Sequence, residues 1–288
     1  MKLVVLVENH TLDPDLKQEH GLSVYVEKDG FRMVYDMGET GLFLENARQL
    51  GVDLSDLDAI AFSHNHCDHC GGFLSYVRKG GKPVPVYVHR GYFRKKWWDH
   101  TKDPVDAPTY ERGMEFIGPV MAPDYFYQNG YTKFRMLPDD VFELAPDIYL
   151  VGNFPLDREN EPPHPSSVME IDPVTFAPDD FRDEQICVIR SKQGLIVLSG
   201  CAHNGIMNIL STIEERFPGE RIHAVFGGTH LIQSEDGRIL KTIQYLNRKD
   251  LRVAGVCHCT GAAAIGQFEA LVPAFADVGS GYVWTDEA

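Results

Sequence analysis

The chain contains 288 residues, of which 43% are hydrophobic and 24% charged, and its formal net charge is −15. This composition suits a globular protein with a substantial core, and the length is allowed for one large layered domain. The acidic balance argues against binding of a nucleic acid polymer, which needs clustered Lys and Arg. It leaves room for a small anionic substrate beside a bound dication.

The N-terminal segment and the cysteines indicate where the protein works. The apolar run at residues 3–7 is too short for the apolar core of a signal peptide, and no stretch approaches the roughly 18 apolar residues of a transmembrane helix. Most of the six cysteines lie beside histidine-bearing turns, which does not suggest a disulfide framework. We therefore expect a cytoplasmic protein with no membrane association. The oligomeric state stays open.

The first part of the chain predicts elements that lead to one dense polar motif. A helix is expected at about residues 41–50, where apolar residues recur at helical spacing. Alternating or apolar runs predict strands at residues 2–8, 22–27, 31–36 and 58–62. The last of these strands ends at Ser63-His64-Asn65-His66-Cys67-Asp68-His69-Cys70-Gly71-Gly72.

Between about residues 91 and 178 the pattern changes to dense aromatics and then to repeated prolines. Strand-like runs recur at residues 141–144 and 148–152, and prolines from Pro155 to Pro178 interrupt regular elements. Long ordered loops are often functional. We predict that this region is an insertion, within a single domain spanning residues 1–288, that partly covers the active site. The run Arg94-Lys95-Lys96 supplies either charge for a substrate or a solvated face.

The C-terminal third repeats one plan, in which a strand ends in a histidine-bearing turn and a helix returns the chain. The turns lie at residues 200–205, 227–230 and 257–261. Ligand sites in layered α/β folds lie at the carboxyl ends of strands, so we expect these turns at one edge. Backbone N–H groups at the helices opened by Asn204-Gly205 and Thr260-Gly261 would attract a phosphate-bearing substrate.

The motif at residues 64–69 has the pattern H-x-H-x-D-H. In an extended turn, His64 and His66 point the same way and can hold one ion, whereas Asp68 and His69 are displaced toward a second. Imidazole and carboxylate ligands suit zinc, iron or manganese. Two ions roughly 3.5–4 Å apart would activate water and clamp a phosphoryl or acyl group.

Ser63 to Gly72 resembles the signature of the metallo-β-lactamase superfamily. The resemblance implies an α/β fold, a four-layer αββα sandwich with one or two metal ions at one edge, and it covers most of the chain. The turns Gly200-Cys201-Ala202-His203, Gly228-Thr229-His230 and Cys257-His258-Cys259 resemble the branch named for 7,8-dihydropterin-6-methyl-4-(β-D-ribofuranosyl)aminobenzene-5′-phosphate synthase, a methanopterin-pathway enzyme.

The chain departs from the superfamily's pattern at two places. Asp183-Glu184 stands where other members have a further histidine, and Cys201 stands where they have a bridging aspartate. Carried over residue by residue, the resemblance assigns His64 and His66 to the first metal, and Asp68, His69 and His258 to the second. His203 is our choice to complete the first site. Cys201 is either a bridging or neighbouring thiolate or a small buried apolar residue.

We expect a metal-dependent hydrolase, or a lyase- or synthase-like variant, in which a metal-bound hydroxide attacks a small anionic ring compound such as a pterin or nucleotide derivative. One or two divalent ions are expected, zinc first and manganese or iron next. Asp68 would orient the water and accept its proton. His230 would donate a proton or contact the substrate, unless it is a core histidine. The alternatives are an iron-dependent redox protein and a non-catalytic metal- or ligand-binding protein.

Overall fold

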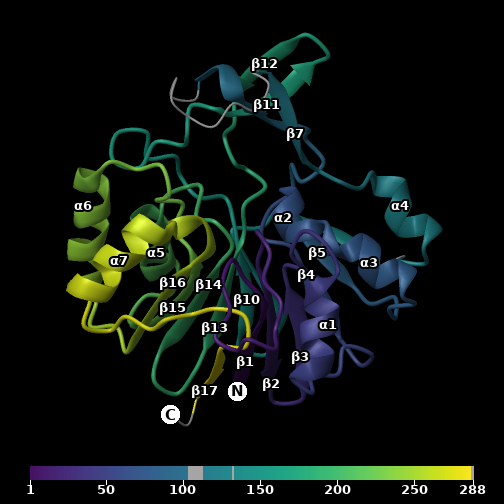
Figure 1. Ribbon diagram of the computed structural model, residues 1–288, viewed down its shortest axis with the longest axis horizontal. Coiled ribbons are helices and arrows are strands. Elements are labelled where there is room, and N and C mark those ends of the chain that lie inside the picture. The colour runs from purple at the N-terminus through teal and green to yellow at the C-terminus, as the bar shows by residue number, and fades with distance from the viewer. Residues whose placement is uncertain (103–112, 132, 287–288) are drawn as a thin grey trace.

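The computed structural model describes residues 1–102, 113–131 and 133–286. Over these residues the strands form sheets of seven, six and four strands. The two larger sheets face each other and carry helices on their outer faces (Figure 1). This arrangement is the αββα sandwich predicted from the sequence. Residues 103–112 of the predicted insertion, which include the aromatic Tyr110, lie outside the described ranges.

The seven-stranded sheet contains both termini of the sandwich. In spatial order it consists of β17 (Val283–Thr285), β1 (Lys2–Val7), β2 (Ser23–Lys28), β3 (Phe31–Tyr35), β4 (Ala59–Ala61), β5 (Val86–His89) and β8 (Phe134–Leu137). The neighbours β3, β4, β5 and β8 are parallel, so their carboxyl ends share one edge. Its outer face packs against α1 (Leu42–Gln49) and α3 (Gly72–Arg78), with the short helices α2 (Cys67–Cys70) and α4 (Pro123–Gln128) beside them (Figure 1).

The six-stranded sheet brings the C-terminal turns together. Its order is β16 (Val253–Cys257), β15 (Ile222–Gly228), β14 (Leu195–Ser199), β13 (Ile186–Arg190), β10 (Ile148–Val151) and β9 (Val141–Ala145). Because β14, β15 and β16 are parallel, the turns that follow them lie at one edge, which confirms the expectation from the sequence. The outer face is covered by α5 (Ile206–Arg216), α6 (Asp236–Asn247) and α7 (Ala262–Leu271) (Figure 1).

The cores form because each element presents apolar residues at its own period. On α5, Ile206, Ile209, Leu210 and Ile213 are fully buried against the six-stranded sheet, which matches the spacing in the sequence. Burying one such side chain contributes about 1.5–3 kcal/mol. A second apolar layer lies between the two sheets, and a third lies under α1 and α3. None of the helices in the described ranges has the length and apolar character that a membrane span requires.

The region predicted as one insertion is divided in the structure. Residues 134–151 supply β8, β9 and β10 to the two main sheets, because their apolar runs pair with β5 and β13. The flanking parts form a small sheet of β12 (Thr175–Pro178), β11 (Ser167–Asp172), β6 (Lys96–Asp99) and β7 (Met114–Gly118), which projects above the sandwich (Figure 1). The short turns His100–Lys102 and His258–Thr260 are 3₁₀ helices. The prolines of this segment therefore did not prevent β11 and β12 from forming in the small sheet.

Candidate metal centre

The histidine motif begins where β4 ends, and its close packing explains the two glycines that follow it. A Cβ atom on Gly72 would lie 2.0 Å from the carbonyl oxygen of Met37, and one on Gly71 would lie 2.3 Å from that of Glu39. Only glycine allows the backbone this approach. The motif is thereby pressed against the turn after β3, which carries Asp36.

The first group of candidate donors comes from both sheets. His64 and Cys201 lie with His203 so that their donor atoms are within 4.8 Å of one another, and all three residues are buried. The Nε2 atoms of His64 and His203 are 3.2 Å apart. His66 lies outside this group, but its ring centroid is 4.4 Å from that of His64 and 4.8 Å from that of His203.

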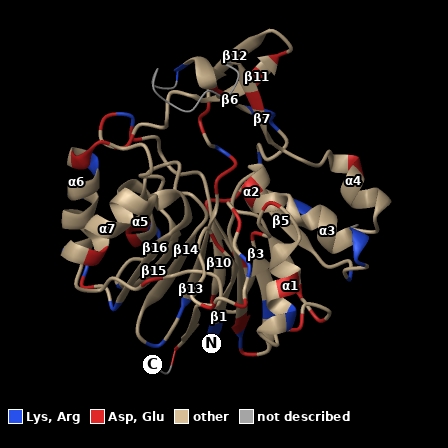
Figure 2. Ribbon diagram, viewed as in Figure 1, with Lys and Arg blue, Asp and Glu red and all other residues tan. Residues whose placement is uncertain are grey.

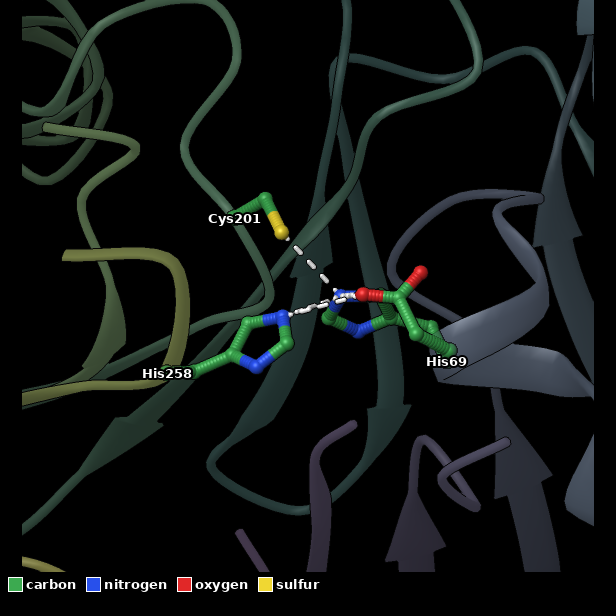
Figure 3. A group of neighbouring side chains, drawn as sticks. His69, Cys201 and His258 are labelled. Carbon is green, nitrogen blue, oxygen red and sulfur yellow. Dashed lines mark hydrogen bonds and ion pairs between the residues drawn. The ribbon is translucent and has the colours of Figure 1, made fainter. Parts of the chain in front are cut away.

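The second group shares the Cys201 thiol. Nε2 of His69 lies 3.1 Å from Nε2 of His258 and 3.1 Å from Sγ of Cys201. Oδ2 of Asp68 is 3.2 Å from Nε2 of His258 and 3.5 Å from Nε2 of His69. Figure 3 shows the side chains of His69, Cys201 and His258 converging from three separate segments. The structure thus places six of the seven residues that the sequence proposed as ligands in these two groups, with Cys201 in both. The seventh, His66, lies beside the first group.

Metal ions fit this donor set. Nε2 of His66 is buried and has no hydrogen-bond partner in the described part of the chain. Burial, reinforced by neighbouring imidazoles and Lys96, holds the pKa values of His64, His66 and His203 well below the usual range. Neutral imidazoles facing one another at a buried gap are the state that binds zinc, manganese or iron.

Residues around the donors hold the rings in place. Nδ1 of His69 donates to Oδ2 of Asp36 at 2.7 Å, so Nε2 is left to face the gap. Nδ1 of His258 lies 2.9 Å from Oδ1 of Asn9. Burial lowers the pKa of His69, but Asp68 and Asp36 outweigh burial and raise the pKa to about 9.

His203 is fixed through its backbone and its ring face. Its N–H donates to Oε1 of Glu184 at 2.7 Å, and the N–H of Asn204 donates to the other oxygen at 2.8 Å. The ring of Phe181 stacks on that of His203 at a centroid distance of 4.0 Å. Glu184, which stands near the superfamily's missing histidine, therefore supports the turn that carries His203, the residue expected from the sequence to replace it.

The structure contradicts one part of each of two expectations from the sequence, and leaves Arg94 and Lys95 exposed as a solvated face would have them. The first backbone N–H groups of α5 are not free to bind a phosphate, because those of Met207 and Asn208 already donate to Glu161 at 3.1 and 2.7 Å. Lys96 is not on a solvated face: its side chain is 2% exposed and lies between Asp179 and Asp183.

His230 lies beside the donors and lines a cavity of about 480 Å³ that His203 also lines. Its ring centroid is 4.3 Å from that of His203. Burial, together with the nearby His164 and Arg238, lowers its pKa to about 3, so a neutral ring is favoured. This favours a hydrogen bond to substrate over proton donation by a charged imidazole.

The aromatic residues of the predicted insertion do not all lie over the candidate site. Phe126 and Tyr131 are buried in the core beneath α3, where they pack on Phe73. Trp98 stacks on His164, a lining residue of the cavity, at a centroid distance of 4.7 Å.

A family model for the metallo-beta-lactamase superfamily matches residues 16–174, which is more than half of the chain. The chain belongs to the metallo-β-lactamase superfamily.

Similarity to individual superfamily members extends over almost the whole chain. The 7,8-dihydropterin-6-methyl-4-(beta-D-ribofuranosyl)-aminobenzene-5′-phosphate synthase of Methanocaldococcus jannaschii is 28% identical over 93% of this chain and 90% of its own length. The anti-Pycsar protein Apyc1 of Saccharibacillus brassicae is 24% identical over 78% of this chain and 83% of its own. The crystal structure of Tm1679, a metal-dependent hydrolase of the beta-lactamase superfamily, has a TM-score of 0.83 at 29% identity and covers 99% of this chain and 98% of that one.

Several residues of this superfamily site were missed from the sequence. Asp36 directly follows β3, the parallel neighbour of the strand that delivers the motif, and this adjacency was the available signal. His20 lies in the loop before β2, and its Nε2 lies 3.3 Å from Oδ2 of Asp68. Lys96 carried no signal, because its carboxylate partners lie more than 80 residues later in the chain.

Proposed function

We propose that the protein is a metal-dependent hydrolase that acts on a small anionic ring compound bearing a phosphate, such as a pterin or nucleotide derivative. The observation that carries the proposal is the pair of donor groups that meet at Cys201, which would hold two ions side by side. The first would be held by His64, His66 and His203, and the second by Asp68, His69 and His258. We propose zinc for both ions, because imidazole, carboxylate and thiolate donors are its common ligands.

Bound divalent metal would lower the pKa of a water molecule so that it attacks at neutral pH. The chain's own residues orient the reaction. Oδ2 of Asp68 faces the imidazoles of His69 and His258, and the carboxylate would accept the proton of the attacking water. The neutral ring of His230 would donate a hydrogen bond to a substrate in the cavity.

The substrate class rests on the cavity and on a relative's name. A volume of about 480 Å³ falls in the range of pockets that hold small ligands. The synthase that is similar to this chain is named for a pterin that carries a ribosyl phosphate. We propose a compound of that class, without assigning the synthase reaction.

We also propose that the protein is cytoplasmic, because all six of its cysteines are free.

The test combines metal analysis with turnover. Purified protein should hold about two zinc or manganese ions and hydrolyse bis(p-nitrophenyl) phosphate. Asp68→Ala should lower turnover by about 10²–10⁴-fold, whereas Asp139→Ala, which changes an exposed carboxylate, should not. Turnover that survives Asp68→Ala, or redox-active iron without any hydrolysis, would contradict the proposal.

A further inference from the structure

The cavity beside the donors extends away from them to the first turn of α6. Its lining includes His203 and His230 as well as Ser234 and Arg238. The first turn of α6 carries a basic position close to acidic ones (Figure 2). Arg238 is therefore on an element that contributes no metal donor, yet it borders the same space as His203.

The guanidinium of Arg238 has donors to spare. Its Nη1 atom donates to the carbonyl oxygen of Pro162 at 3.1 Å, which fixes the side chain against the loop that covers the cavity. Its Nε atom is buried and has no hydrogen-bond partner among the described residues. The buried carboxylate of Glu161, an electrostatic neighbour of Arg238, accepts the backbone N–H groups of Met207 and Asn208 instead. An arginine stays charged at neutral pH, so the cavity contains a positive charge without a bonded counter-ion.

Other groups near the donors that could bind an anion already have partners. Lys96 contacts two carboxylates, and the backbone N–H groups at the start of α5 donate to Glu161. Among the described lining residues, Arg238 is the permanent cation, and the one carboxylate, Glu235, is an exposed side chain at the start of α6. An unpaired guanidinium edge is suited to bidentate contact with phosphate oxygens.

We propose that Arg238 binds a phosphate group of the ligand at a distance from the metal donors, and so makes the cavity specific for phosphate-bearing ring compounds. The proposal rests on the proposed function in taking His203 as part of the reaction centre. Gln233 and Ser234 line the same cavity and offer neutral donors to the phosphate.

The probe is guanosine 5′-monophosphate, compared with guanosine, in calorimetric titrations of the zinc-loaded full chain. The wild type should bind the monophosphate at least about tenfold more tightly, as charge-assisted hydrogen bonds predict. Arg238→Met should remove most of this preference, and Arg238→Lys should keep part of it. The matched control is Arg248→Met, at the exposed far end of the same helix. Thermal melts of each variant verify folding.

Repeating the titrations after chelation separates Arg238 from the metals. A preference that survives chelation and disappears in Arg238→Met supports the proposal. No preference in the wild type, or an undiminished preference in Arg238→Met, overturns it, and the second result would place the phosphate on the metals. Bis(p-nitrophenyl) phosphate turnover is measured in parallel. An inactive wild type that still prefers the monophosphate would contradict the proposed function alone, whereas an active enzyme without the preference would contradict this inference alone.

Discussion

Nζ of Lys96 lies 2.6 Å from Oδ1 of Asp183 and 3.1 Å from Oδ2 of Asp179, and all three side chains are at most 3% exposed. The other oxygen of Asp183 accepts the N–H of Asn65, the residue between His64 and His66. Nζ of Lys96 also lies 4.5 Å from the ring of Phe181, which stacks on His203. One buried lysine of the small sheet thus supports both segments that carry the first donor group.

Replacing Lys96 with methionine should therefore destabilise the fold strongly. The change leaves two buried carboxylates without their cation, and breaking a buried pair in this way costs about 3–5 kcal/mol. Urea unfolding of the variant measures the loss. Lys95→Met is the matched control, since Lys95 is an exposed neighbour whose partner is Glu170. A loss below about 1 kcal/mol for Lys96→Met would show that the pair does not hold the fold.

Asp36→Asn should weaken metal binding at the second donor group. The carboxylate of Asp36 accepts Nδ1 of His69 at 2.7 Å and Oγ of Ser63 at 2.6 Å, so it sets which nitrogen of His69 faces the gap. Loss of such a partner lowers metal affinity by about 10–100-fold. Zinc competition titrations measure this, with Asp56→Asn as the exposed control. Unchanged affinity would mean that the ring is held by packing alone.

Metal removal should make stability sensitive to acid. Burial lowers the pKa values of His64, His66 and His203 below that of an unfolded histidine, about 6.5, so the unfolded state binds more protons below that pH. The free energy of unfolding of chelated protein should fall as the pH drops below about 6.5, by up to about 1.4 kcal/mol per pH unit for each histidine. His69, with its pKa raised to about 9, contributes in the opposite direction as the pH rises toward that value.

Urea titrations of chelated and zinc-loaded protein between pH 5 and pH 9 measure this difference. Zinc present at about 1,000 times its dissociation constant should add about 4 kcal/mol at neutral pH. Identical stability of the two forms at every pH would contradict the assignment of these histidines as ligands.

Glu161→Ala should loosen the loop that borders the cavity. It leaves the N–H groups of Met207 and Asn208 without their acceptor, which costs about 1–3 kcal/mol. Gly205 explains how the carboxylate comes so close, since its φ is +85° and a Cβ there would lie 2.4 Å from Glu161. Hydrogen exchange at the two amides should accelerate. The exposed Glu159 provides the control variant, Glu159→Ala, whose exchange should match the wild type.

The sequence determined the parts of this protein that depend on local order. His64, His66, Asp68 and His69 are ligand types within six positions, and the strand before them and the glycines after them fix a turn at a sheet edge. The parallel strands of the C-terminal third, each ending in a histidine-bearing turn, were readable for the same reason. Periodicity within ten residues is enough to define a strand or a helix and the face it buries.

The tertiary structure alone decided how those pieces meet. Cys201 is placed between the two donor groups only because β14 ends opposite the motif, and Asp36 reaches His69 only because β3 lies beside β4. Lys96 looked like a surface charge because its aspartates lie 83 and 87 positions later. Arg238 borders the cavity because α6 packs beside the covering loop. Such contacts depend on which segments the fold brings together, and local sequence patterns do not encode that pairing.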